Sequence, residues 1–114
     1  MNSETRNAFT ELVNNCLADV RGEIWLERAK SKLFDDAEAS KFNTARAVEV
    51  VQIAMERAVM EVMGSTGAIT VRGIRGDGVF ENLACDYVED FKRKTFVEDQ
   101  RASRTGLLSK LFGK

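Results

Sequence analysis

Residues 44–63 carry apolar side chains at the three- and four-residue spacing of a helical face, and this run constrains the fold more than any other. The face is formed by Val48, Val51, Met55, Ala58, Val59 and Val62, and Ala47 and Ala54 widen it. This pattern predicts one long helix whose apolar side is buried. We therefore expect a mainly α fold in which three or four helices pack around this central helix.

The same run has a second, narrower apolar patch on its polar side. Ile53 and Met60 lie there, one heptad apart. Either another helix of the same chain covers this patch, or a second copy or another protein does, and the pattern leaves both open. Trp25 is the only tryptophan. Core packing is its ordinary role, but tryptophan is also enriched in binding hot spots.

The region before the central run predicts helix with a change of direction. Its first part has an apolar face made of Phe9, Leu12, Val13, Cys16, Leu17, Val20 and Ile24. The next apolar face is rotated away from the first, and its members are Trp25, Leu26, Ala29 and Leu33. A kink or break at Gly22 would allow both faces to meet one core. A polar connection over residues 35–40 follows, and Asn43 or Thr44 can cap the central helix.

The segment after Gly64 permits two interpretations. Residues 68–72 alternate and are rich in β-branched side chains, which predicts a short strand, and Asp77-Gly78 is typical of a hairpin turn. Residues 80–94 instead carry a helical apolar stripe, and we favour a helix there. We therefore expect a mainly α fold with one short strand or hairpin near residues 68–80. This β element would place the fold at the margin of the α+β class.

The length of 114 residues suits one domain, and 44% hydrophobic with 31% charged residues indicates a globular chain. We expect residues 1–94 to form a single helical domain and residues 95–114 a basic, partly flexible tail. Leu107, Leu111 and Phe112 make the end of that tail amphipathic, but two turns of helix are marginal alone. No apolar run approaches a membrane span and no signal-peptide pattern begins the chain, so we expect a cytoplasmic protein.

Motifs for catalysis or metal binding are weak. The chain has no histidine, and Cys16 and Cys85 do not form a Cys-x-x-Cys pair, which excludes the usual zinc sites and thiol–imidazole catalysis. We expect Cys16 to be buried on its apolar stripe and Cys85 to be exposed.

Acidic residues at helical spacing offer one further possibility. Asp86, Glu89 and Asp90 could share a magnesium ion if Glu23 and Glu27 lay nearby, but a solvated acidic face is the favoured explanation. We expect no enzymatic activity, no metal and no cofactor.

The most suggestive short motif lies at residues 72–78, where glycines and arginines alternate. Arg72, Arg75 and the backbone amides of Gly76 and Gly78 could hold a phosphate group. The spacing matches neither a P-loop nor a dinucleotide fingerprint, and a turn that needs glycine explains it equally well.

These observations favour a non-enzymatic interaction protein of adaptor or inhibitor type that binds another protein as a homo-oligomer. The expected interaction surface comprises Trp25, Ile53, Met60, Leu107, Leu111 and Phe112. The alternative is binding of an anion, a nucleotide or a nucleic-acid phosphate through residues 72–78 and the basic tail. A net charge of −1 does not favour a nucleic-acid partner.

Overall fold

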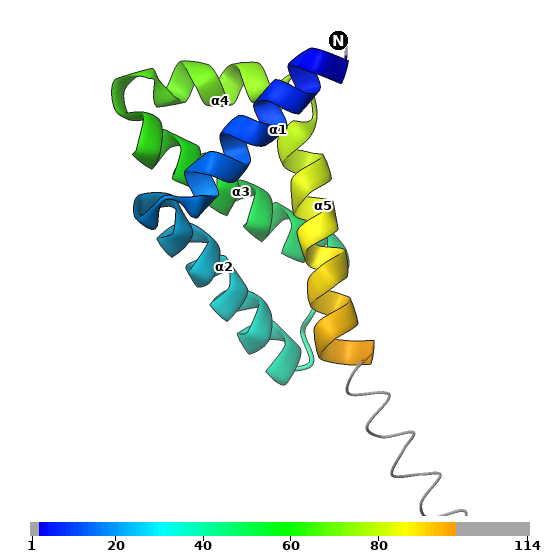
Figure 1. Cartoon of the computed structure of the whole chain (residues 1–114). Helices are drawn as coiled ribbons and strands as arrows, with labels where there is room; N and C mark the ends of the chain where they lie inside the picture. Colours follow the sequence, from blue (N-terminus) through cyan, green and yellow to red (C-terminus); the bar gives the residue numbers. More distant parts are fainter. Residues whose placement is uncertain (1–2, 98–114) are drawn as a thin grey trace, which may run out of the picture.

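The computed structural model describes residues 3–97, and their regular structure is helical throughout (Figure 1). The elements are α1 (Ser3–Ala18), α2 (Val20–Glu38), α3 (Thr44–Met63), the 3-10 turn η1 (Gly64–Thr66), α4 (Gly67–Arg75), α5 (Val79–Lys92) and the π-helical turn η2 (Arg93–Val97). The prediction of a mainly α fold is confirmed. None of these helices combines the length and apolar character that a membrane span requires.

Helix α3 contacts each of α1, α2, α4 and α5. In Figure 1, α1 crosses in front of α3, α4 lies above it, and α2 and α5 descend on either side. The buried residues of α3 are Ala47, Val51, Ala54, Met55, Ala58 and Val59. They follow the apolar face expected from the sequence, while Val48 and Val62 at its edges are half-buried. Asn43 caps the helix, because its side chain accepts a hydrogen bond from the Arg46 amide at 3.1 Å.

The chain bends between α1 and α2, so that the two rotated apolar faces meet one core. The break lies at Asp19, three residues before the position expected from the sequence. Asp19 has extended backbone angles and its carboxylate accepts a hydrogen bond from the Arg21 amide at 2.9 Å, which starts α2. Gly22 is buried inside α2 against the carbonyl group of Cys16. The glycine thus permits the close packing beside the bend rather than forming the break.

The prediction of a strand or hairpin near residues 68–80 is wrong, because residues 67–75 form helix α4. Gly67, Val71 and Ile74 are buried, and their four- and three-residue spacing is helical. A helix satisfies its own backbone hydrogen bonds, whereas a single strand would need a partner that residues 3–97 do not supply. Gly78, at a φ of 75°, makes the turn between α4 and α5 instead of a hairpin.

Helix α5 confirms the preferred interpretation of the following residues, with bounds of 79–92 in place of 80–94. Aromatic rings pack its end against α2 and the connection between α2 and α3. The ring centroid of Phe91 lies 4.9 Å from that of Phe34 and 5.7 Å from that of Phe42, and Phe42 also contacts Phe96 at 5.0 Å. This cluster closes the lower end of the core.

Candidate functional site

Helices α2 and α3 form the most extensive helix pair, and a buried carboxylate lies at one end of it. Asp36 near the end of α2 is buried and pairs with Lys32 at 3.2 Å and with Arg46 of α3 at 3.8 Å. At the other end of the pair, Gly22 faces Ala58. The two helices therefore run antiparallel and leave a groove along their outer side.

This groove has a volume of about 210 Å³. Its lining comes from α2 through Trp25, Arg28, Ala29 and Lys32, and from α3 through Val50, Ile53, Ala54 and Arg57. Apolar side chains form most of the surface, and three of the described lining residues are basic while none is acidic. The structure thus brings together Trp25 and Ile53, which the sequence indicated separately.

Trp25 is half-buried and lies between charged neighbours from both helices. The guanidinium carbon of Arg28 lies 4.9 Å from the indole centroid, and that of Arg57 lies 5.4 Å away. Both distances are within the range of cation–π attraction. Neither arginine has a carboxylate partner within the described part of the chain. The indole Nε1 is buried and lacks an acceptor there, which is an unusual state for a buried donor.

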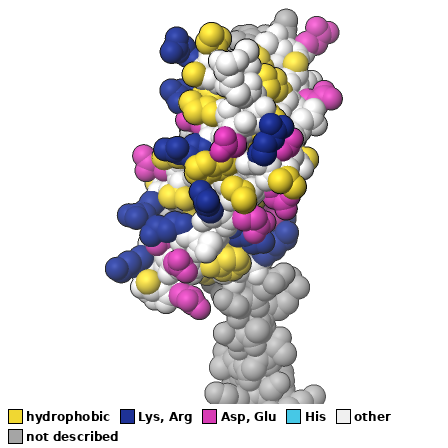
Figure 2. Space-filling model, turned by 90° about the vertical axis from the view of Figure 1, so that its left-hand side faces the viewer, with side chains coloured by type: hydrophobic (Ala, Val, Ile, Leu, Met, Phe, Trp, Pro, Cys, Tyr) yellow, Lys and Arg dark blue, Asp and Glu magenta, His cyan; other side chains and the backbone are white. Residues whose placement is uncertain are grey.

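The second apolar patch of α3 is left open by residues 3–97. Ile53 is 52% exposed and Met60 is 41% exposed. The side of the molecule formed by α2 and the α3–α4 junction shows apolar side chains scattered among charged ones of both signs (Figure 2). The described helices therefore leave this patch uncovered, and Ile53 extends the apolar surface of the groove.

The glycine- and arginine-containing segment at residues 72–78 is used within the fold. Arg75 binds Glu56 of α3 through two hydrogen bonds, of 2.8 Å from Nη2 and 3.2 Å from Nε, and this pairing raises the pKa of Arg75. The amide of Gly76 donates to the carbonyl of Arg72 at 3.3 Å, and the amide of Gly78 donates to that of Arg75 at 3.2 Å. These amides are thus not free for a phosphate.

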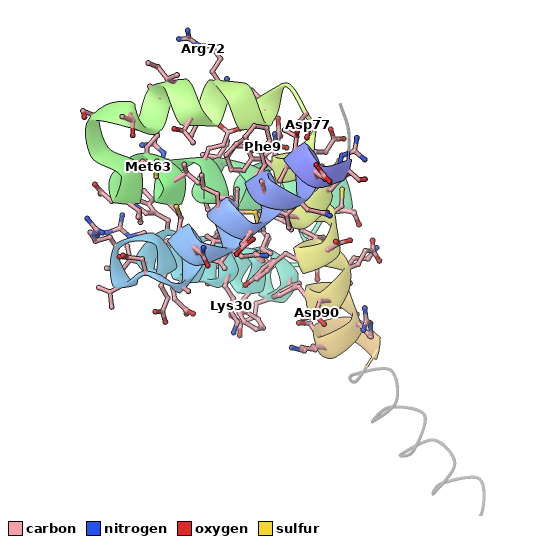
Figure 3. The ribbon with its side chains drawn as sticks, turned by 45° about the horizontal axis from the view of Figure 1, so that its top comes forward. Phe9, Lys30, Met63, Arg72, Asp77 and Asp90 are labelled. Carbon is pink, nitrogen blue, oxygen red and sulfur yellow. The ribbon has the colours of Figure 1, made fainter. Side chains whose placement is uncertain are left out.

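Arg72 is the remaining cation of that segment, and it projects outward from α4 (Figure 3). Asp77 follows the C-terminal end of α4, close to α1 in Figure 3, and its side chain is only 3% exposed. Its Oδ2 is 3.9 Å from Arg6 Nε, which is an ion pair but too long for a hydrogen bond. Because Arg75 and the amides of Gly76 and Gly78 are already bonded within the fold, the geometry does not support the anion-binding alternative.

A second cavity, of about 200 Å³, lies between α2 and the end of α5. It is lined by Lys30, Phe34, Tyr87, Asp90, Phe91, Lys94 and Thr95. Burial is the main cause that raises the pKa of Tyr87, and Glu27 and Asp90 contribute. Asp90 already pairs with Lys94 at 3.1 Å, so this cavity has few polar groups free for a ligand.

The acidic and thiol groups form no reactive cluster in residues 3–97. No three His, Cys, Asp or Glu side chains there lie close enough to hold a metal ion. Glu89 pairs with Lys92 at 3.4 Å, as expected for a solvated face. Cys16 is buried and Cys85 is exposed, as the sequence predicted. Burial, followed by the nearby charge of Asp19, raises the pKa of the Cys16 thiol.

Three residues of the expected interaction surface, Leu107, Leu111 and Phe112, lie outside the described residues. The sequence interpretation also missed the arginines on Trp25. Arg28 could have been found, because it follows Trp25 by three residues and so shares its side of α2. Arg57 belongs to another helix, and no local signal links it to Trp25.

Protein-family models, curated proteins and solved structures were each compared with the chain, and none of them matches it.

Proposed function

We propose that this protein is a non-enzymatic interaction protein that binds another protein through the groove between α2 and α3. One observation carries the proposal: Trp25 and Ile53, from two different helices, line one groove that residues 3–97 leave open. Burying such apolar surface at an interface is favourable, and a tryptophan beside arginines is the composition most enriched among binding hot spots.

The homo-oligomer expected from the sequence concerns this same surface, because Ile53 and Met60 are the exposed large apolar residues of α3. Homo-oligomerisation is a separate prediction from binding of a different protein. A second copy and a different protein would both bury the groove, so the experiment must separate the two.

Site-specific photocrosslinking in the native host tests the proposal. A photoreactive phenylalanine analogue is placed at Ile53 of the full chain. The matched control has it at Ile69 of α4, which is apolar and 72% exposed but lies on a helix that does not line the groove. We expect one crosslinked product to be enriched at position 53, with unchanged thermal unfolding in both variants. Mass spectrometry distinguishes a crosslinked dimer from a different partner. Equal products from both positions would contradict the proposal.

A further inference from the structure

The two arginines of the groove differ from most arginines on the described surface, which pair with a carboxylate. Arg21, Arg46 and Arg75 each pair with a carboxylate of the same chain. Arg28 and Arg57 instead lie on the Trp25 ring without such a partner. Two guanidinium groups are thus held beside an apolar surface with their hydrogen-bond donors available, which suits carboxylates of a bound molecule.

The shape of the groove suits a helix. It lies between two antiparallel helices, and on α2 it extends from Trp25 to Lys32, about 10 Å or two turns at the helical rise. Ala29 and Ala54 lie within it, and their small side chains allow the backbone of a third helix to approach closely. An amphipathic helix binds such a groove through apolar residues three and four positions apart.

Charge argues against two occupants that the chain itself could supply. A two-fold dimer through this groove would place Arg28 and Arg57 near the same residues of the second copy, and unpaired like charges at an interface are unfavourable. Residues 98–114 contain four basic residues against two acidic ones, so their charge has the same sign as the groove. An acidic partner would not be repelled by the arginines of the groove.

From these observations we infer that the partner presents an amphipathic helix whose apolar stripe is flanked by Asp or Glu. The apolar stripe lies on Trp25, Val50 and Ile53, and the flanking carboxylates pair with Arg28 and Arg57. This inference rests on the proposed function and specifies the chemistry of the partner.

Three synthetic peptides of about 18 residues test the inference, each with the same leucine stripe and with flanking positions occupied by Glu, Gln or Lys. Binding to the full chain is measured by the anisotropy of a dye on the peptide, and Trp25, the only tryptophan, reports occupancy of the groove by its fluorescence. We expect the Glu peptide to bind about tenfold more tightly than the Gln peptide, with the Lys peptide weakest, and added salt to reduce this preference.

Charge reversal of the groove gives the matched control. Arg28→Glu combined with Arg57→Glu should invert the order, so that the Lys peptide binds most tightly. Arg72→Glu, at an exposed and unpaired arginine on α4, should leave the wild-type order intact. Thermal unfolding of each variant verifies that it is folded.

Equal binding of the three peptides, or binding of none, would overturn the inference. Stronger quenching of Trp25 by a single-stranded oligonucleotide than by the Glu peptide would also overturn it, in favour of a nucleic-acid partner. The crosslinking result at Ile53 is independent of these outcomes. If the peptides failed but position 53 still gave an enriched product, the protein would bind a partner of different charge and the proposed function would stand. Loss of that enrichment would contradict the proposed function itself.

Discussion

Gly22 of α2 lies against the carbonyl group of Cys16 in α1, and no side chain fits between them. A Cβ on Gly22 would lie 2.9 Å from the carbonyl carbon of Cys16 and 3.2 Å from the Cβ of Ala58. At Gly22, the first turn of α2 therefore packs on both the last turn of α1 and helix α3. This contact fixes the bend that brings Trp25 to the edge of α3.

Replacing this glycine by alanine should destabilise the protein. The clash involves backbone atoms, which cannot move aside easily, and overpacking of this kind costs about 1–3 kcal/mol. The gain in helix propensity from Gly22→Ala is smaller, about 0.5–1 kcal/mol. Urea unfolding should therefore show a lower midpoint for the variant. A midpoint equal to or above that of the wild type would contradict the close approach.

Two glycines of α4 should respond to alanine in opposite directions. A Cβ on Gly67 would lie 2.7 Å from the Cα of Met60, whereas a Cβ on Gly73 would meet nothing within 4 Å. Gly67→Ala should destabilise the fold by about 1–3 kcal/mol. Gly73→Ala should stabilise it by about 0.5–1 kcal/mol, because alanine favours helix. The same urea measurement compares them, and equal shifts would indicate that residues 67–75 do not pack as a helix on α3.

Two methionines of α3 distinguish the core from the open surface. Met55 is 3% exposed and Met60 is 41% exposed. Met55→Ala should lower the free energy of unfolding by about 2–5 kcal/mol, since it leaves a cavity. Met60→Ala, the matched control, should change that free energy by less than about 1 kcal/mol. A large loss at Met60 would show that this side chain is covered in the folded protein.

The bend also has a measurable pH signature. Hydrogen bonds from the side chain and then the backbone amide of Arg21 lower the pKa of Asp19 to about 2, from an ordinary value of 3.8. Because the pKa is lower in the folded state, the ionised carboxylate stabilises the fold above pH 3.8, and this contribution is lost as the pH falls through about 2. In Arg21→Gln, an NMR titration of Asp19 should shift toward 3.8, and Arg72→Gln should leave it unchanged. An unaltered midpoint in Arg21→Gln would exclude this pairing.

Local pattern was sufficient for most helices and insufficient for α4. The long stripes of α3 and α5 span several turns, so the helical period could be recognised in each of them. Residues 67–75 form only two turns and are rich in β-branched side chains, so propensity favoured a strand. Burial of Val71 and Ile74 against the rest of the core outweighed that preference. Such an outcome depends on neighbours distant in sequence, which a local window does not contain.

The candidate site illustrates the same difference. Trp25 could be recognised in the sequence as the only tryptophan. Ile53 could be recognised as an apolar residue on the polar side of a helical run. Their shared groove depends on the antiparallel alignment of α2 and α3, along which Asp36 of α2 pairs with Arg46 of α3. The position of Arg57 on the Trp25 ring follows from that alignment.

The sequence by itself determined the helical class, the buried face of residues 44–63 and the separation of Ile53 and Met60 from that face. Periodicity carries this information, because a helix places residues three and four apart on one side whatever surrounds it. Only the tertiary structure decided that the second patch is left open by residues 3–97 and that Ile53 lines a groove with two unpaired arginines. The exposure of a side chain and the pairing of a charge depend on all neighbouring residues in space. Those neighbours come from helices that are far apart in the chain.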